Sequence, residues 1–239
     1  MSRRFEELDW RPTPMGDLVL RRRWDPVLGC DVHEIKLGEE FLMSSAFTAA
    51  EEAMARLALA EVPRQEGVEV AVGGLGLGFT AQAVLQHAGV ESLVVVEALP
   101  EVVEWHERGL IPAGEELSAD GRCRFVEGDF FALADSEAGL DPREPERRFH
   151  AVLVDIDHSP AHLLAEGHAG FYRAEGLRRL ARFLHPGGVF ALWSNDPPEA
   201  RFSAELGAVF AEVRADVVTF PNPLQERDAA NTVYIGQTP

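Results

Sequence analysis

The sequence has little of the chemistry that marks secreted, membrane-spanning or cysteine-based metal proteins. Its 239 residues include only two cysteines, Cys30 and Cys123, which are too few and too far apart for a disulfide framework or a pair of metal-binding knuckles. No segment approaches the roughly 18 consecutive apolar residues of a membrane span, and the charged start is followed by no apolar stretch. These features predict a cytoplasmic protein that neither enters a membrane nor depends on disulfides.

Positive charge is also scarce. The 22 Lys and Arg residues stand against 40 Asp and Glu residues, which gives a formal net charge of −18. A nucleic-acid partner is therefore not expected, and the summed field favours a cationic or neutral small molecule. The remaining composition, 46% hydrophobic and 26% charged, is that of a globular protein able to bury a sizeable core.

The first part of the chain predicts a small β-rich segment. Two strand-like runs, Asp17–Arg23 and Asp31–Met43, are separated by turn residues and predict a β-hairpin or small meander. Ser44 and Ser45 can cap a helix over Ala46–Leu59. We therefore divide the chain into residues 1–62, a β-rich segment with a linking helix, and residues 63–239. The only basic run, Arg21 to Arg23, is expected on a solvated strand edge.

From residue 63 onward, apolar strands alternate with amphipathic helices. This alternation predicts an α/β domain whose largely parallel, doubly wound sheet is covered on both faces, and the last two strands should be antiparallel because no crossover helix fits between them. The turn Pro186-Gly187-Gly188 should precede the fifth strand. The predicted strands are Val68–Val72, Leu93–Glu97, Cys123–Val126, Ala151–Ile156, Val189–Ser194, Val213–Phe220 and Thr232–Ile235, and the predicted helices are Phe79–His87, Pro100–Arg108, Phe130–Ala134, Gly170–Leu184 and Pro198–Val209.

Three features follow successive strands of this domain and predict a nucleotide site. A glycine-rich loop with Gly74, Gly76 and Gly78 joins the first strand to a helix, where backbone can approach a ligand closely. Glu97 ends the second strand, where a carboxylate can accept both ribose hydroxyls. Asp129 follows the third strand and can either accept the exocyclic amine of adenine or serve only as a helix N-cap. All three should face one crevice at the carboxyl edge of the sheet.

The residues from Gly73 to Asp155 resemble the spermidine synthase family, whose fold is that of the class I S-adenosylmethionine-dependent methyltransferases. The likeness continues through Phe171-Tyr172 and the run from Leu184 to Val189, and it covers about two-thirds of the chain. It implies a Rossmann-like seven-stranded sheet, a donor whose adenosine is bound by Glu97 and Asp129, and a homodimer.

Departures from the family pattern bear on the reaction. Gly76 stands where aminopropyl-transferring members have an Asp that attracts the free amine of decarboxylated S-adenosylmethionine, so this loop should tolerate the carboxylate of intact S-adenosylmethionine. The family's two acceptor-binding aspartates correspond to Asp155 and His158, and its Tyr-His pair corresponds to Ala49-Ala50.

These residues predict the catalytic and acceptor-binding groups. Asp155 and His158 are expected to be catalytic, with His158 as a general base that Asp155 or Asp157 orients, although His158 can equally be an ordinary loop histidine. Asp157 and Tyr172 are expected to line the acceptor pocket. A metal site at His158, His162 and His168 is disfavoured, because Pro160 interrupts the helical spacing of His158 and His162 and no cysteine is near.

Three functions remain open on the sequence. The first is methyl transfer from S-adenosylmethionine to a small, cationic or neutral acceptor, because the donor loop has lost its discriminating carboxylate. The second is aminopropyl transfer from decarboxylated S-adenosylmethionine to a polyamine, which the overall resemblance supports. The third is a catalytically silent, nucleoside-binding member of the family.

Overall fold

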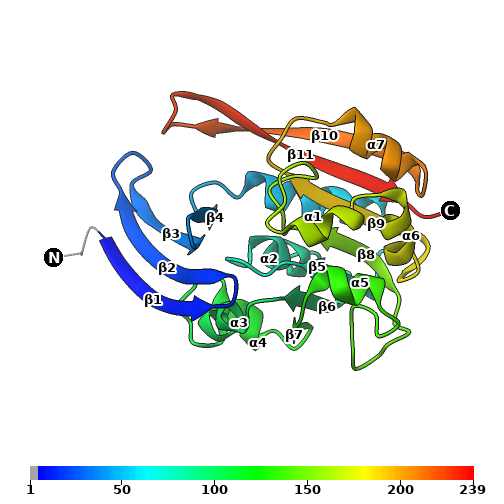
Figure 1. Ribbon diagram of the computed structural model, residues 1–239, viewed down its shortest axis with the longest axis horizontal. Coiled ribbons are helices and arrows are strands. Elements are labelled where there is room, and N and C mark those ends of the chain that lie inside the picture. Colours follow the sequence, from blue (N-terminus) through cyan, green and yellow to red (C-terminus); the bar gives the residue numbers. More distant parts are fainter. Residues whose placement is uncertain (1–4) are drawn as a thin grey trace.

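The computed structural model describes residues 5–239 and contains two sheets (Figure 1). A four-stranded antiparallel sheet of order β1-β2-β3-β4 is followed by a seven-stranded sheet of order β10-β11-β9-β8-β5-β6-β7. Strands β5 to β9 are parallel, whereas β11 runs antiparallel to both β9 and β10. This arrangement confirms the predicted α/β sheet with its antiparallel closing pair. The strands of the larger sheet are β5 (Val68–Gly73), β6 (Val90–Glu97), β7 (Cys123–Glu127), β8 (Phe149–Val154), β9 (Leu184–Ser194), β10 (Ala211–Asn222) and β11 (Arg227–Gln237).

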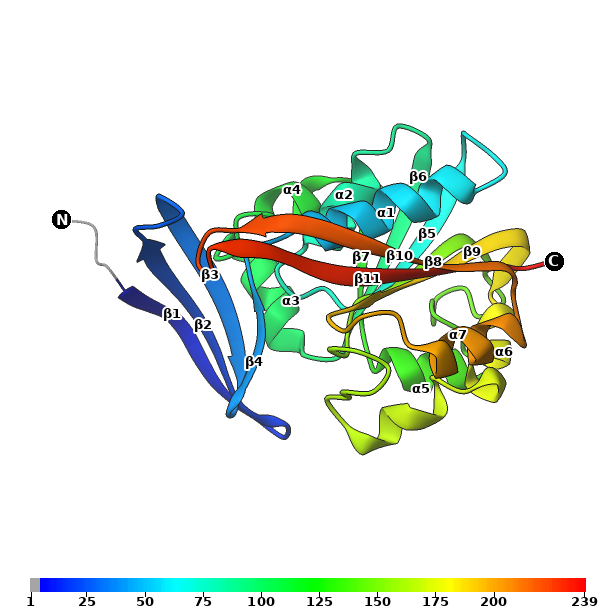
Figure 2. The ribbon, with the colours of Figure 1, turned by 90° about the horizontal axis from the view of Figure 1, so that it is seen from above.

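Helices cover both faces of the larger sheet, because its central strands are apolar on both sides. Val70 and Val72 of β5 belong to one core cluster, while Ala71 belongs to the other. Figure 2 shows α5, α6 and α7 together on one side of the sheet and α1, α2 and α4 on the opposite side. The helices are α1 (Ala49–Glu61), α2 (Phe79–Leu85), α3 (Pro100–Glu107), α4 (Gly114–Ala119), α5 (Phe130–Asp135), α6 (Ala174–Ala181) and α7 (Ala200–Gly207). None of these helices is both long and apolar enough to cross a membrane.

The N-terminal sheet is a four-stranded antiparallel meander, which confirms the small meander and not the simple hairpin among the two predicted forms. Its strands are β1 (Phe5–Thr13), β2 (Gly16–Asp25), β3 (Cys30–Leu37) and β4 (Glu40–Ser44). The second predicted run divides at Gly38, whose φ of 56° allows the chain to reverse. Leu18, Leu20, Ile35 and Leu37 of this sheet belong to the same apolar cluster as the larger sheet. The division predicted after residue 62 falls one residue beyond the end of α1.

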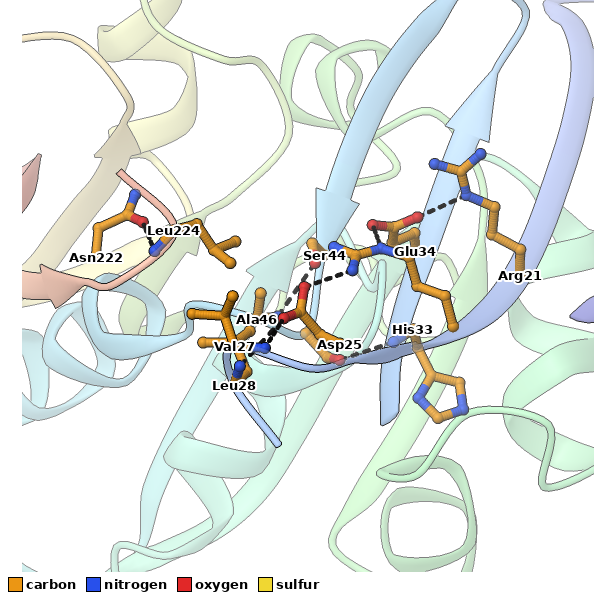
Figure 3. A network of polar contacts seen from close by, with 12 residues as sticks. Arg21, Asp25, Val27, Leu28, His33, Glu34, Ser44, Ala46, Asn222 and Leu224 are labelled. Carbon is orange, nitrogen blue, oxygen red and sulfur yellow. Dashed lines mark hydrogen bonds and ion pairs between the residues drawn. The ribbon is translucent and has the colours of Figure 1, made fainter. Parts of the chain in front are cut away.

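The arginines of β2 do not form the solvated strand edge predicted for them. Strand β2 lies between β1 and β3, and Figure 3 shows Arg21 directed toward Glu34 of β3. The side chains of Arg21 and Arg23 both pair with Glu34, at N–O distances of 2.6 and 2.8 Å. Glu34 is 3% exposed, so the two guanidinium groups compensate a buried carboxylate. Arg22 projects to the other face and pairs with Glu6 of β1.

Several predicted element boundaries are also wrong. Neither serine caps α1: Ser45 Oγ accepts the N–H of His33, Ser44 Oγ accepts the N–H of Ala46, and the helix begins later, after Thr48. The two serine side chains therefore stabilise the chain as it leaves β4 and do not cap the helix. The helix predicted over Gly170–Leu184 is shorter in the structure: Gly170 ends a 3-10 helix, η1 (Glu166–Gly170), α6 covers only Ala174–Ala181, and Leu184 already belongs to β9.

The turn predicted at Pro186-Gly187-Gly188 lies inside β9 and not before it. The pairing of β9 with β8 shifts between Leu184 and Val189, so these three residues form a bulge at the start of the strand. Gly187 has a φ of 72°, which the bulge requires. Helix α4 was not predicted from the sequence at all.

Candidate functional site

The site lies where the strand order of the larger sheet reverses. Strands β5, β6 and β7 follow one another in one direction, whereas β8 and β9 extend from β5 in the other. In open parallel sheets, ligands bind outside the carboxyl ends of the strands at such a switch point. A cavity of about 290 Å³ lies along this edge of the sheet. Residues at the ends of β5, β6, β7 and β8 line it together with Leu37, Leu42 and Met43 of the N-terminal sheet, Met15 of the turn between β1 and β2, and Glu51 of α1.

The glycine loop lines this cavity at the end of β5. Gly74 has a φ of 93°, and a Cβ there would lie 2.1 Å from the carbonyl oxygen of Asp155. Glycine is therefore required for the loop to pass the chain that leaves β8. Gly74 and Gly76 line the cavity, whereas Gly78 lies at the start of α2, where a Cβ would meet Leu117 and His106. The sequence thus identified two cavity glycines and one that accommodates helix packing.

Glu97 ends β6 and is fixed by backbone N–H groups. Its carboxylate accepts from Leu75 and Leu99 at 2.9 Å each and from Gly76 at 3.5 Å. Burial raises the pKa of Glu97, and these hydrogen bonds act in the opposite direction. The side chain therefore ties the glycine loop to β6 and also lines the cavity, at the place predicted for a ribose.

Asp129 serves as the N-cap of α5 and lines the same cavity. Its Oδ1 accepts the N–H groups of Phe131 and Ala132 at 2.9 and 3.2 Å. The cap bonds use only Oδ1, so Oδ2 is available to a second donor. Capping and a contact with a nucleobase are thus compatible in one side chain. Phe130 and Phe131 line the cavity next to it.

Two carboxyl groups from distant parts of the chain interact at the cavity wall. Asp155 follows β8, and Glu51 lies in the first turn of α1. Burial, together with the charge of Asp155, raises the pKa of Glu51 to about 8. Burial raises the pKa of Asp155 to about 6, although the Thr80 hydroxyl donates to it at 2.6 Å. Two like charges in one partly desolvated site disfavour full ionisation, so the pair tends to retain a proton near neutral pH.

Met43 of β4 occupies the space beside Gly76. A Cβ on Gly76 would lie 2.3 Å from Met43 Sδ, and this sulfur is 3.0 Å from the backbone nitrogen of Leu77. At Gly76, where the spermidine synthase pattern has an Asp side chain, the space is therefore occupied by the thioether of Met43 from the N-terminal sheet. No carboxylate stands there to discriminate between donors.

The predicted catalytic and acceptor residues are distributed around the cavity. His158 lines it, and its Nε2 lies 4.0 Å from Glu40 Oε2, whereas neither Asp155 nor Asp157 forms a hydrogen bond to it within residues 5–239. Asp157 and Tyr172 stand behind the cavity wall: both are buried, and the Tyr172 hydroxyl donates to Asp157 at 2.7 Å. These two side chains hold the loop after β8 together.

Glu51, Met43 and His168 are cavity residues that the sequence analysis did not single out as site residues. Glu51 directly follows the Ala49-Ala50 pair that replaces the family's Tyr-His pair. This proximity to an acceptor-binding position of the family could have indicated Glu51 as a site residue. His168 follows no recognisable spacing, and Met43 lies in an ordinary strand pattern. Both reach the cavity only through tertiary packing.

The histidines considered for a metal have other partners. His162 contacts Asp196 at 2.8 Å, and His168 contacts Asp157 at 2.9 Å. Within residues 5–239, the one group spaced for a metal is Glu69, His150 and His185, at the starts of β5, β8 and β9. It lies at the opposite edge of the sheet from the cavity.

Comparison with known proteins identifies the fold. No protein-family model matches the chain. The chain is similar to the crystal structure of spermidine synthase from Thermotoga maritima, with a TM-score of 0.73 and 16% identity over 98% of this chain and 73% of that one. A spermidine synthase in complex with the transition-state analogue AdoDATO gives a TM-score of 0.73 and 17% identity over 98% of this chain and 74% of that one. The protein therefore has the spermidine synthase fold, with its N-terminal antiparallel sheet and seven-stranded mixed sheet.

Proposed function

We propose that this protein is a nucleoside-dependent transferase that moves the aminopropyl group of decarboxylated S-adenosylmethionine to an amine acceptor. The observation that carries the proposal is the pair of carboxyl groups, Glu51 and Asp155, at the wall of the cavity. A cationic amine relieves the repulsion within this pair, whereas the carboxylate of intact S-adenosylmethionine would add further negative charge beside it. The fold shared with spermidine synthases supports the same class of donor.

The side chains along the sheet edge suit the two halves of such a donor. In this proposal Glu97 accepts the ribose hydroxyls and Asp129 accepts the exocyclic amine of adenine, while the glycines at 74 and 76 let the donor approach the backbone. The donor supplies an activated sulfonium centre. The protein's part is to align the acceptor nitrogen with the carbon beside that sulfur and to exclude water.

The acceptor must lose a proton before its nitrogen can attack, because an aliphatic amine is an ammonium ion near neutral pH. Asp155 has a pKa raised to about 6, and it lies next to a second carboxyl group. A carboxylate with a raised pKa is a better proton acceptor than an ordinary one, so Asp155 is our candidate general base. His158 lines the same cavity and is the second candidate.

Methyl transfer from S-adenosylmethionine is the second candidate function. The observation that favours it is the loop at Gly76, where Met43 fills the space of the family's discriminating Asp. We rank it below aminopropyl transfer because Glu51 and Asp155 supply two carboxyl groups to the same cavity. The scarcity of cysteine supports a reducing compartment, the cytoplasm, for either reaction.

Calorimetric titration with intact and decarboxylated donor separates the two candidates. We expect the decarboxylated donor to bind at least about tenfold more tightly, a difference of about 1.4 kcal/mol. Incubation with straight-chain diamines should then release 5′-methylthioadenosine and give a product that mass spectrometry identifies as aminopropylated. Tighter binding of intact S-adenosylmethionine with a methylated product would instead establish the second candidate. Donor binding without turnover across amines, thiols and carboxylates would indicate the catalytically silent member.

A further inference from the structure

His168 lies in η1, and a buried carboxylate holds its ring against the cavity. Its Nδ1 is 2.9 and 3.0 Å from the two oxygens of Asp157, and the His168 side chain is 14% exposed. Asp157 itself has no exposed side-chain surface. The side chain of Asp157 thus contacts the segment that carries His168, and not the acceptor pocket in which it was expected.

The partners of Asp157 determine which nitrogen of His168 carries the proton. The carboxylate also accepts the N–H of Leu164 and the hydroxyl of Tyr172, each at 2.7 Å. An ionised carboxylate only accepts hydrogen bonds, so the Nδ1 of His168 must be its donor. In the neutral ring, Nε2 then carries a lone pair on the side away from Asp157.

The ring of His168 also stacks on Phe131. Their centroids are 4.0 Å apart and their planes are inclined by 30°. Phe131 donates its backbone N–H to Asp129, the side chain that our proposed function assigns to adenine. His168 therefore belongs to the part of the cavity around Asp129 and Phe131, whereas the acceptor part contains Glu51 and Asp155. This placement argues for contact with a base and against proton transfer from the acceptor.

We propose that His168 is a nucleobase-specificity residue, whose Nε2 accepts one hydrogen of the purine 6-amino group while Asp129 accepts the other. Asp157 is then a positioning residue that fixes the tautomer and the plane of the ring. A 6-oxo purine would present a carbonyl oxygen to these two acceptors and leave both unpaired, so the site should select adenosine over inosine. This inference rests on the proposed binding of an adenosine-bearing donor.

The test measures the binding of 5′-methylthioadenosine and 5′-methylthioinosine by calorimetry. These probes lack the amino-acid tail, so the result does not depend on the choice between methyl and aminopropyl transfer. We expect the native protein to prefer the adenosine compound by about tenfold or more. His168→Phe keeps an aromatic ring beside Phe131 but removes the acceptor nitrogen, and it should lose most of this preference through weaker binding of the adenosine compound alone.

Two further variants keep the test decisive. His168→Gln has an amide oxygen that can accept from the purine 6-amino group. Its preference for the adenosine compound should therefore lie between those of the native protein and His168→Phe. If His168→Phe does not fold, the comparison of His168→Gln with the native protein tests the inference. His162→Phe is the matched control, because His162 is on the same loop, 71% of its side chain is exposed and it contacts Asp196 outside the cavity lining. Its preference should equal that of the native protein.

Three results would overturn the inference in different ways. If both nucleosides bind the native protein but His168→Phe and His168→Gln keep the full preference, His168 does not read the base, and the proposed function stands. If the variants keep the preference but lose turnover, His168 takes part in the chemistry instead. If neither nucleoside binds the native protein, the proposed function fails and this inference fails with it.

Discussion

Glu51 shows how a single residue at the cavity wall can make stability depend on pH. Burial and the charge of Asp155 raise the pKa of Glu51 from 4.5 to about 8 in the folded protein. The folded state thus holds a proton that the unfolded state releases over this range, and the resulting stabilisation is complete below about pH 4.5 and is lost as pH rises through 8.

The variant Glu51→Gln should isolate this effect, because glutamine resembles the protonated acid. We expect its free energy of unfolding to match that of the native protein near pH 5 and to exceed it by about 1 to 3 kcal/mol near pH 9. Urea denaturation at both pH values measures the difference. Glu107→Gln, at an exposed position of α3, should show no such pH-dependent gain. An equal gain in both variants would mean that overall charge, not the site, is responsible.

Glu97 offers a second residue-level prediction, which concerns binding. Glu97→Ala removes the acceptor proposed for the ribose and releases the N–H groups of Leu75 and Leu99. Donor binding should weaken by about 1.5 to 3 kcal/mol, the range for a hydrogen bond to a charged group. Titration of 5′-methylthioadenosine by calorimetry measures this loss. Unchanged affinity in the folded variant would mean that Glu97 only stabilises the glycine loop and does not bind the ribose.

At the scale of elements, the contact between β4 and the glycine loop couples the two sheets. Met43 Sδ fills the space beside Gly76, so Gly76→Ala should be destabilising, and Met43→Ala should reduce the cost of the added methyl group. A double-mutant cycle in urea should give a favourable interaction free energy of about 0.5 to 3 kcal/mol. The φ of 48° at Gly76 adds a strain that Met43→Ala cannot relieve, so the double variant stays less stable than Met43→Ala alone. Additive effects would show that the two positions do not interact.

Elements were predictable where a local pattern determines them. The apolar runs of β5 to β9 and the N-cap at Asp129 follow from sequence periodicity and capping chemistry. The bulge at Gly187 and the serines that fasten the exit of β4 were not predictable, because each depends on a partner strand. For the same reason the sequence indicated Glu97 and Asp155 but not His168, whose position depends on the buried Asp157.

At the scale of the whole molecule, the resemblance implies a homodimer, and this remains a prediction. The N-terminal sheet carries several large apolar side chains with substantial exposure, among them Phe5 at 56%, Trp10 at 48% and Trp24 at 44%. Light scattering after gel filtration should give twice the mass of the 26.3 kDa chain. A mass of one chain at micromolar concentration would contradict the expectation.

The net charge of −18 makes a prediction that belongs to the molecule as a whole. A diamine approaching the cavity is attracted both by the summed field of the surface and by Glu51 and Asp155 at the wall. Salt screens exposed charges over about 8 Å at physiological ionic strength and affects partly buried groups much less. Diamine affinity should therefore fall as salt rises, in the native protein and in Glu51→Gln alike.

The two contributions can be separated by comparing these proteins over a salt series. At pH 9, where Glu51 is largely ionised, Glu51→Gln should bind the diamine more weakly at every salt concentration, yet the slope of log affinity against log salt should stay close to the native value. The reason is that the slope reports the screened surface field, whereas the offset reports the partly buried carboxyl pair. If the substitution removed the slope as well, the attraction would be confined to the cavity, and the excess acidic charge would have no part in recruiting a cationic acceptor.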